Sequence, residues 1–154
     1  LNRRAAARAA AQLAQIALER LQLAVAKGWQ KRAETYLRGD DRSRELGLVL
    51  YMAVRLALVE GSAERAYEDA QRIHELGREL GDADLEGLGL AYSGHALLTL
   101  GDVDGGLDRQ SEAAAAVLSG QITPWVGSVI YCSVIWTCRN RADWQRAAQW
   151  TEQF

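Results

Sequence analysis

The feature that most constrains the fold is a turn that recurs along the chain, followed each time by a similar short pattern. Four segments share it, GWQKRAETYL, GSAERAYEDA, GDVDGGLDRQ and ADWQRAAQWT, which begin at Gly28, Gly61, Gly101 and Ala142, at intervals of 33, 40 and 41 residues. Each carries a small residue five positions after its start: Ala33, Ala66, Gly106 and Ala147. Two helices that cross closely need a small side chain at their contact. A period of this length, with one helical hairpin per unit, is typical of an α-solenoid.

The segments between the turns have the hydrophobic period of helices. Leu46, Val49, Leu50 and Ala53 begin an i, i+3, i+4 stripe that predicts a helix from Ser43 to Glu60, ended by Gly61. Further helices are expected at residues 62–80, 85–100, 102–119 and 123–140, with Thr123-Pro124 as a start signal and Asp143 opening a last one. Upstream, a long helix is expected to reach about Lys27, and Gly28 to lead into a second one at residues 30–38. We therefore predict an all-α chain of about four antiparallel hairpins, with units at residues 1–39, 43–81, 84–120 and 123–154 of a single repeat domain from a longer protein.

The turns carry a resemblance to tetratricopeptide (TPR) repeats. GDVDGGL at Gly101 and ADWQRAA at Ala142 are similar to the family's Gly-Asp, aromatic or apolar residue, then Ala pattern, although Gly106 and Ala142 depart from it. Gly94 falls where the first helix of such a unit carries glycine. The unit proline and the first-helix Trp are missing and the units exceed 34 residues, so the resemblance implies a divergent TPR-like α-solenoid.

Two longer stretches carry a narrower resemblance. LGRELGDADLEGLGLAYSGHALLTLGDVDGGL and VGSVIYCSVIWTCRNRADWQRAAQWTEQF resemble the helical-repeat region of large actinobacterial LuxR-type transcriptional regulators. Such proteins carry an ATPase or cyclase-like domain upstream of the repeats and a DNA-reading helix-turn-helix downstream. The resemblance implies a region that couples the binding of a signal or partner to the rest of the polypeptide.

Composition and charge exclude several classes of function. With 18 basic and 20 acidic residues, the net charge is -2, so the chain as a whole offers no basic field for nucleic acid or an anionic membrane. Arg3, Arg4 and Arg8 are expected to form a solvated helix face. The longest apolar runs are too short to span a bilayer, and no signal peptide is present, so we expect a cytoplasmic protein.

The sequence contains no recognisable catalytic or cofactor motif. A phosphate-binding GxxxxGK[ST] loop, an H-E-x-x-H zinc motif and a G-x-S-x-G nucleophile elbow are all missing. Cys132 and Cys138 are six residues apart, about 240° around a helix, so they cannot share a metal ion, and an intracellular setting disfavours a disulfide. Most carboxylates lie in turns, where they are expected to cap helices, as in Asp82-Ala83-Asp84. We expect no catalytic residue, no bound cofactor and no metal.

A partner-binding surface is the remaining hypothesis. In TPR-like hairpins the first helix of each unit lines the concave face. Registering the units on their turns places there Tyr51, Arg55, Ala91, His95, Cys132, Trp136 and Arg139. Arginine and aromatic side chains are the usual energetic anchors of such contacts, so this surface would suit a peptide or an aromatic, partly acidic ligand.

Each aromatic residue also has a structural interpretation. Trp136 and His95 could equally belong to the core, whereas Tyr92, Trp144 and Trp150 are expected in the core and Trp125 is expected to shield a helix end. The leading prediction is a non-enzymatic region of a multidomain transcriptional regulator that binds a protein, a peptide or a small-molecule effector. The alternative is a free-standing adaptor or scaffold that self-associates, for example as a homodimer, through its terminal hairpins.

Overall fold

The computed structural model describes residues 2–153, which form eight α-helices and no strand. The helices are α1 (Arg3–Glu19), α2 (Leu23–Tyr36), α3 (Arg44–Val59), α4 (Ala63–Leu80), α5 (Ala83–Leu100), α6 (Val103–Leu118), α7 (Pro124–Asn140) and α8 (Trp144–Gln153). The chain is therefore all-α, as predicted. Leu1 and Phe154, which belong to the first and last predicted units, lie outside the described residues.

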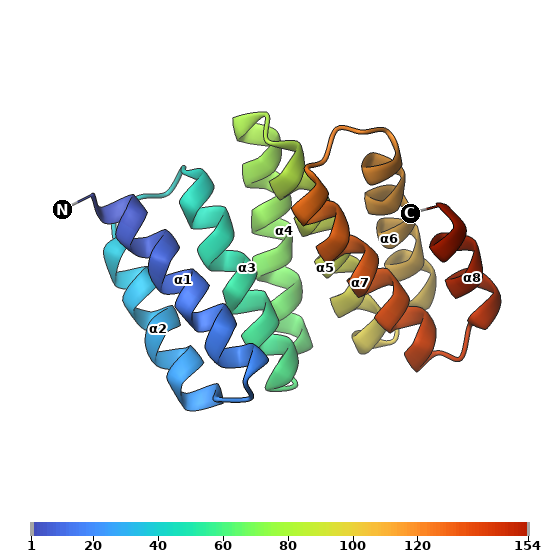
Figure 1. Ribbon diagram of the computed structural model, residues 1–154, viewed down its shortest axis with the longest axis horizontal. Coiled ribbons are helices and arrows are strands. Elements are labelled where there is room, and N and C mark those ends of the chain that lie inside the picture. The colour runs from blue at the N-terminus through green and yellow to red at the C-terminus, as the bar shows by residue number, and fades with distance from the viewer. Residues whose placement is uncertain (1, 154) are drawn as a thin grey trace.

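Consecutive helices form antiparallel pairs that follow one another along the molecule (Figure 1). We call α1, α3, α5 and α7 the first helices, and α2, α4, α6 and α8 the second helices. Each first helix contacts the next first helix, and α2, α4 and α6 also contact the first helix of the following pair. The contact between α4 and α5 is the most extensive in the molecule.

The turns inside the pairs share one geometry. The residue that follows the last helical turn has a positive φ at Leu21 (58°), Gly61 (78°), Gly101 (94°) and Ala142 (54°). In each case the next amide donates a hydrogen bond to the carbonyl five residues earlier, as in Gln22 to Ala17 and Ser62 to Ala57. This 6→1 bond caps the carbonyl end of a helix. The four turns are therefore one structural element used four times.

The prediction of a first turn at Gly28 is wrong, because α1 ends at Glu19 and Gly28 lies inside α2. The true turn at Leu21 contains no glycine, and the alanine-rich sequence keeps its helical period through the break. With Leu21 in place of Gly28, the turns lie 40, 40 and 41 residues apart. The small residue five positions later becomes Ala26, which is fully buried, instead of Ala33.

The middle of the molecule is packed through glycine. A Cβ atom on Gly89 of α5 would lie closer than 3.0 Å to the backbone of His74 in α4, and one on Gly77 would collide with the backbone of Glu86. On the other side of α5, a Cβ on Gly94 would lie 2.7 Å from the carbonyl oxygen of Gly106 in α6. The backbones of α4, α5 and α6 therefore approach one another directly. This close approach agrees with the expectation for Gly106, whose own Cβ would meet Leu98 at 2.5 Å.

Two clusters of buried side chains form the core. One cluster spans α3 to α7 and contains large residues such as Ile73, Leu76 and Leu88. The other joins α1 and α2 to α3 and is built mainly from alanines, with Val49, Met52 and Leu56 supplied by α3. None of the helices in the described part of the chain has the length and apolar character that crossing a bilayer requires.

Candidate binding surface on the first helices

A run of rings crosses three first helices. The Tyr51 and Tyr92 rings meet edge to face with centroids 5.2 Å apart, and their hydroxyl oxygens lie 3.4 Å apart. His95 lies next to Tyr92 at 6.2 Å and stacks on Trp136 with centroids 4.4 Å apart. We call Tyr51, Tyr92, His95 and Trp136 the ring run. It joins α3, α5 and α7 into one surface, and the guanidinium of Arg55 lies 5.8 Å from the Tyr51 ring centroid at its edge.

The ring run is buried at its centre, at Tyr92 and His95, and exposed to solvent at its end, at Trp136. Burial lowers the pKa of His95 to about 4, so its imidazole is neutral at pH 7. Its buried Nδ1 has no hydrogen-bond partner among the described residues. Burial, followed by the interaction with Tyr51, raises the pKa of Tyr92 well above its usual range. Trp136 is 44% exposed, so the end of the run on α7 is accessible to a ligand.

A groove adjoins the ring run at Tyr51. It has a volume of about 400 Å³ and lies between α1, α3 and the first turn of α7. Its apolar walls are Ala11, Leu48, Tyr51, Met52 and Trp125, and its polar rim is Arg8, Gln12, Gln15 and Arg44. In Figure 1 α1 and α7 lie nearest the viewer, and the faded α5 lies behind α7. Trp125 is half exposed, so it offers a ring face to an occupant of the groove.

Three arginines on this surface have no ion pair with any described residue. They are Arg8 on α1, Arg55 on α3 and Arg139 on α7, each from a different hairpin. By contrast, Arg44 on the rim of the groove is held by two carboxylates. The first helices together carry six arginines and four acidic residues, although the whole chain has an excess of acid. The first helices therefore carry a small excess of positive charge, unlike the chain as a whole.

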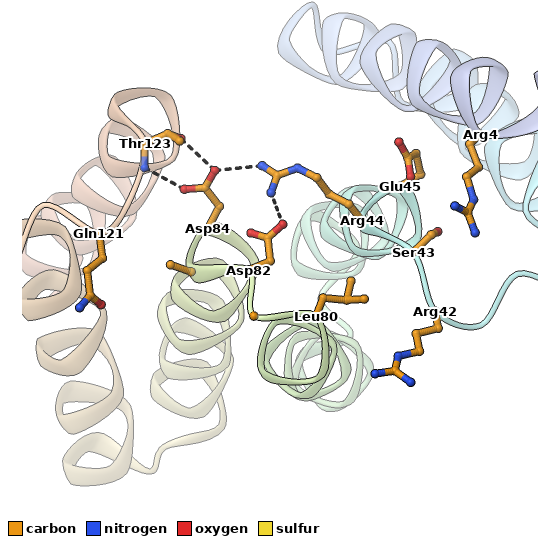
Figure 2. Close-up of a pocket in the computed structure, with 12 residues that line it drawn as sticks. Arg4, Arg42, Ser43, Arg44, Glu45, Leu80, Asp82, Asp84, Gln121 and Thr123 are labelled. Carbon is orange, nitrogen blue, oxygen red and sulfur yellow. Dashed lines mark hydrogen bonds and ion pairs between the residues drawn. The ribbon is translucent and has the colours of Figure 1, made fainter.

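A second cavity, of about 650 Å³, lies where the hairpins join one another (Figure 2). Figure 2 shows the Arg44 guanidinium between Asp82 and Asp84, and Thr123 on the other side of Asp84. Asp84 is 5% exposed; it accepts hydrogen bonds from the Thr123 amide at 2.8 Å, the Thr123 hydroxyl at 2.9 Å and Arg44 at 2.9 Å. Burial opposes ionisation of Asp84, but these hydrogen bonds outweigh it, so its pKa lies below the usual value.

The side chains that line this second cavity bind one another across the hairpins, so they do not form an anion-binding site. Its arginines already have partners: Arg4 binds Asp40 at 2.7 Å, Arg42 donates to the carbonyl of Glu79, and Arg44 binds the two aspartates. Asp82, not Asp84, caps α5, because its side chain accepts a hydrogen bond from the Leu85 amide. Asp84 lies in the first turn of α5, as expected for a carboxylate near a helix N-terminus, but the expectation that it caps the helix is wrong. Its carboxylate joins three hairpins.

The structure places the seven residues expected on the concave face as follows. Tyr51, Arg55, His95 and Trp136 lie in or beside the ring run. Cys132 is exposed on α7, one turn before Trp136, and lies near enough to Tyr92 to influence its ionisation. Ala91 is fully buried beneath the run, so it offers no surface. Arg139 is exposed near the end of α7.

Sequence reasoning missed the role of Tyr92 as a link between rings and missed two residues of the groove, Arg8 and Trp125. Tyr92 packs half-buried against the larger core cluster, in line with its expected place, and it also links Tyr51 to His95, which was not expected. Arg8 and Trp125 line the same groove although they are far apart in sequence, and no local pattern signals that they lie on one surface. The expectation for Trp144 is also wrong, because this side chain is 64% exposed on α8. Trp150 packs half-buried against the larger core cluster.

The described residues contain no group of three or more His, Cys, Asp or Glu side chains that could hold a metal ion. The accessible side chains of the groove and the ring run include Trp125, Trp136 and the unpaired arginines. Comparison with protein-family models, with curated proteins and with solved structures finds no match to this chain.

Proposed function

We propose that the chain is a non-catalytic, TPR-like α-solenoid that binds a peptide segment of another protein on its first helices. The observation that carries this proposal is the groove that opens beside the ring run, with Trp125 on its wall and Arg8 on its rim. Grooves that combine a ring face, apolar side chains and arginine are typical of peptide recognition. The 40-residue spacing of the turns supports the solenoid, because stacked hairpins leave an extended curved surface.

The preferred peptide has an acidic residue next to an aromatic or large apolar one. Arg8 has no carboxylate partner among the described residues, and Trp125, which is half exposed, supplies a ring face, whereas Tyr51 is only 3% exposed. A side chain next to a carboxylate paired with Arg8 would lie in the apolar part of the groove, where Leu48 and Trp125 are accessible. Binding of this kind combines charge with burial of apolar surface.

Selection from a random twelve-residue peptide library tests the proposal. We expect recovered peptides to share an acidic residue close to an aromatic one. We also expect Trp125→Ala and Arg8→Gln each to raise the Kd at least tenfold. Trp144→Ala is the matched control, because Trp144 is more exposed than Trp125 but lies on α8, away from the groove. Equal affinity of Trp125→Ala and the unsubstituted chain for the peptide would contradict binding in the groove.

The wider role that we propose is coupling, in the cytoplasm, of this binding event to the activity of a LuxR-type transcriptional regulator. It rests on the stretches quoted above, which include Gly94, Gly101 and the IYCSVIWTC segment of α7. The test is the full-length polypeptide. An ATPase segment before these repeats and a helix-turn-helix after them would support the role, and a full-length protein without a DNA-reading segment would contradict it.

A further inference from the structure

Three side chains lie at equivalent places in the first turns of successive first helices. The turns are spaced by 40, 40 and 41 residues, so Arg44, Asp84 and Trp125 each lie the same number of residues before the turn that follows their helix. Arg44 and Trp125 line the groove, on its rim and on its wall. Asp84, which comes between them in the row of helices, lines the second cavity and not the groove. A buried carboxylate outside the groove therefore separates two residues of the groove.

Asp84 binds both sides of this row (Figure 2). One carboxylate oxygen accepts hydrogen bonds from the Arg44 guanidinium and from the Thr123 hydroxyl, each at 2.9 Å, and the other accepts from the Thr123 amide at 2.8 Å. Thr123 is joined to Trp125 through Pro124, whose ring fixes its own φ. The bonds to Thr123 therefore constrain the backbone from which the Trp125 side chain projects.

Thr123 uses its side chain for this link and not for its own helix. It is the N-cap residue of α7, where a threonine oxygen ordinarily accepts a hydrogen bond from a helix amide, yet it makes no such bond within the described residues. Asn2, Ser43 and Asp82, the N-caps of the other three first helices, all make that bond. The start of α7 thus differs from the other helix starts in being bound to Asp84.

Apolar packing holds the start of α7 on α5. Ile122 and Val126 are buried, and the Cδ1 atom of Ile122 would lie 2.5 Å from a Cβ on Gly87 of α5. Between α7 and α3, by contrast, the described part of the chain shows no extensive contact. The groove needs both helices, because α3 supplies most of its apolar wall and α7 supplies Trp125. The Asp84 bridge is therefore the polar connection that relates these two walls.

We propose that Asp84 is the positioning residue of the peptide groove, which holds Trp125 at a fixed place relative to α3 although it does not line the groove itself. This role rests on the proposed function, because it concerns how the same groove keeps the shape that a peptide side chain enters. Asp82 also binds Arg44, so Arg44 stays on the rim when Asp84 is changed. The wall that moves is then the one that carries Trp125.

Fluorine resonance spectra of the chain labelled with 5-fluorotryptophan test the position of Trp125 without a ligand. The resonance of Trp125 is assigned by its loss in Trp125→Phe. We expect Asp84→Asn to shift or broaden it, because asparagine has a single acceptor oxygen and leaves either the Thr123 amide or Arg44 without an acceptor. Thr123→Val, which removes only the hydroxyl donor, should change the resonance less, and Thr123→Ser should leave it unchanged.

The tightest-binding peptide from the twelve-residue library is the probe for binding. We expect Asp84→Asn to raise its Kd about tenfold and Thr123→Val to raise it about threefold, because a site whose supporting contacts are loosened binds less tightly. Thr123→Ser, which keeps the hydroxyl, should keep the affinity. Arg4→Gln is the matched control for both measurements, since it removes the ion pair with Asp40 at the equivalent place in α1 and does not line the groove.

An unchanged Trp125 resonance in Asp84→Asn would overturn the proposal and show that packing on α5 is enough to place Trp125. An unchanged Kd in Asp84→Asn, or an equal loss of affinity in Arg4→Gln, would overturn it too. If Asp84→Asn loses its helical circular dichroism, Thr123→Val decides by the same two measurements. A failure of the proposed function looks different: Trp125→Ala would then bind the peptide as the unsubstituted chain does, while the fluorine resonance still reports whether Asp84 positions Trp125.

Discussion

Helices α1 and α5 are both the first helix of a hairpin, but they differ in the number of helices that they contact and in the number of their buried residues. α5 contacts α3, α4, α6 and α7, and ten of its eighteen residues are buried. α1 contacts α2 and α3, and its buried residues are five alanines and one leucine on one side. The two helices therefore share a register of turns but not a set of neighbours. The number of helices that pack against a first helix therefore determines how many of its residues are buried.

The largest expected effect comes from Gly89→Ala, which gives α5 the residue that α1 has at the equivalent Ala9. A Cβ there would collide with the backbone of His74, which cannot rotate away. We expect a loss of about 2–3 kcal/mol in the free energy of unfolding, measured in urea. Gly28→Ala in α2 is the control, because nothing lies within 4 Å of its Cβ position, and it should gain about 0.5–1 kcal/mol. A gain at both positions would contradict the difference in packing.

A somewhat smaller effect is expected at Asp84, whose equivalent in α1 is Arg4. Asp84→Asn replaces a charged acceptor of the Arg44 and Thr123 hydrogen bonds, so we expect a loss of about 2 kcal/mol at pH 7. Because the pKa of Asp84 is lowered by folding, its contribution is present above the unfolded pKa of about 3.9 and lost as the pH falls through the folded value.

The difference between Asp84→Asn and the unsubstituted chain should therefore shrink in acid, which urea unfolding at pH 7 and pH 3 measures. Arg4→Gln is the matched control in α1, since its ion pair with Asp40 is exposed on the arginine side. It should destabilise the chain less than Asp84→Asn. An equal loss of stability in the two variants would contradict the expected difference between the Asp84 and Arg4 interactions.

A third effect depends on pH and concerns His95, whose equivalent in α1 is Gln15. Burial lowers the pKa of His95 to about 4, while an unfolded histidine titrates near 6.5. The unfolded chain then binds more protons between these values, so stability is full above pH 6.5 and falls as the pH drops toward 4. We expect His95 to account for about 2 kcal/mol of that fall.

His95→Gln should remove this component of the pH dependence, and nuclear magnetic resonance titration of the imidazole should give the low pKa directly. Loss of the ring stack on Trp136 is common to all pH values, so the slope and not the level of stability is the informative quantity. An unchanged slope between pH 6.5 and 4 would show that His95 titrates as an exposed histidine does.

The smallest effect is expected at the turns that follow the two helices. Leu21 has a φ of 58° and is 90% exposed, whereas Gly101 occupies the same place after α5 with a φ of 94°. The left-handed conformation disfavours a branched side chain, so Leu21→Gly should stabilise the chain by about 0.5–1 kcal/mol. Gly101→Leu should destabilise it by a similar amount. Thermal unfolding of both variants checks the pair, and two changes of the same sign would contradict equivalence of the turns.

The sequence predicts helix ends well where glycine or proline marks them. Gly61, Gly81 and Gly101 lie at helix ends with positive φ, and Pro124 begins α7. The first turn escapes prediction because Leu21 adopts a left-handed conformation without a glycine, while Gly28 lies harmlessly within α2. A local sequence pattern therefore does not predict a turn in which the residue of positive φ is not glycine.

Some features of the candidate surface can likewise be predicted from the sequence and others cannot. The helical period is enough to place Tyr51, Arg55, His95 and Trp136 on one side of their helices. It does not bring Arg8 near Trp125, nor Thr123 to Asp84, because these contacts depend on how successive hairpins are rotated against one another. That rotation is set by close contacts between glycines and backbone in α4, α5 and α6, which a single sequence does not display.

The Asp84 carboxylate has a mechanical consequence for the row of hairpins. It receives hydrogen bonds from Arg44 at the start of α3 and from Thr123 at the start of α7, so it works as a tie across α5. Any bending that separates α3 from α7 at this end stretches the tie first. The ring run joins the same three helices farther along, so α3, α5 and α7 are linked by a carboxylate at one end and by packed rings beyond it.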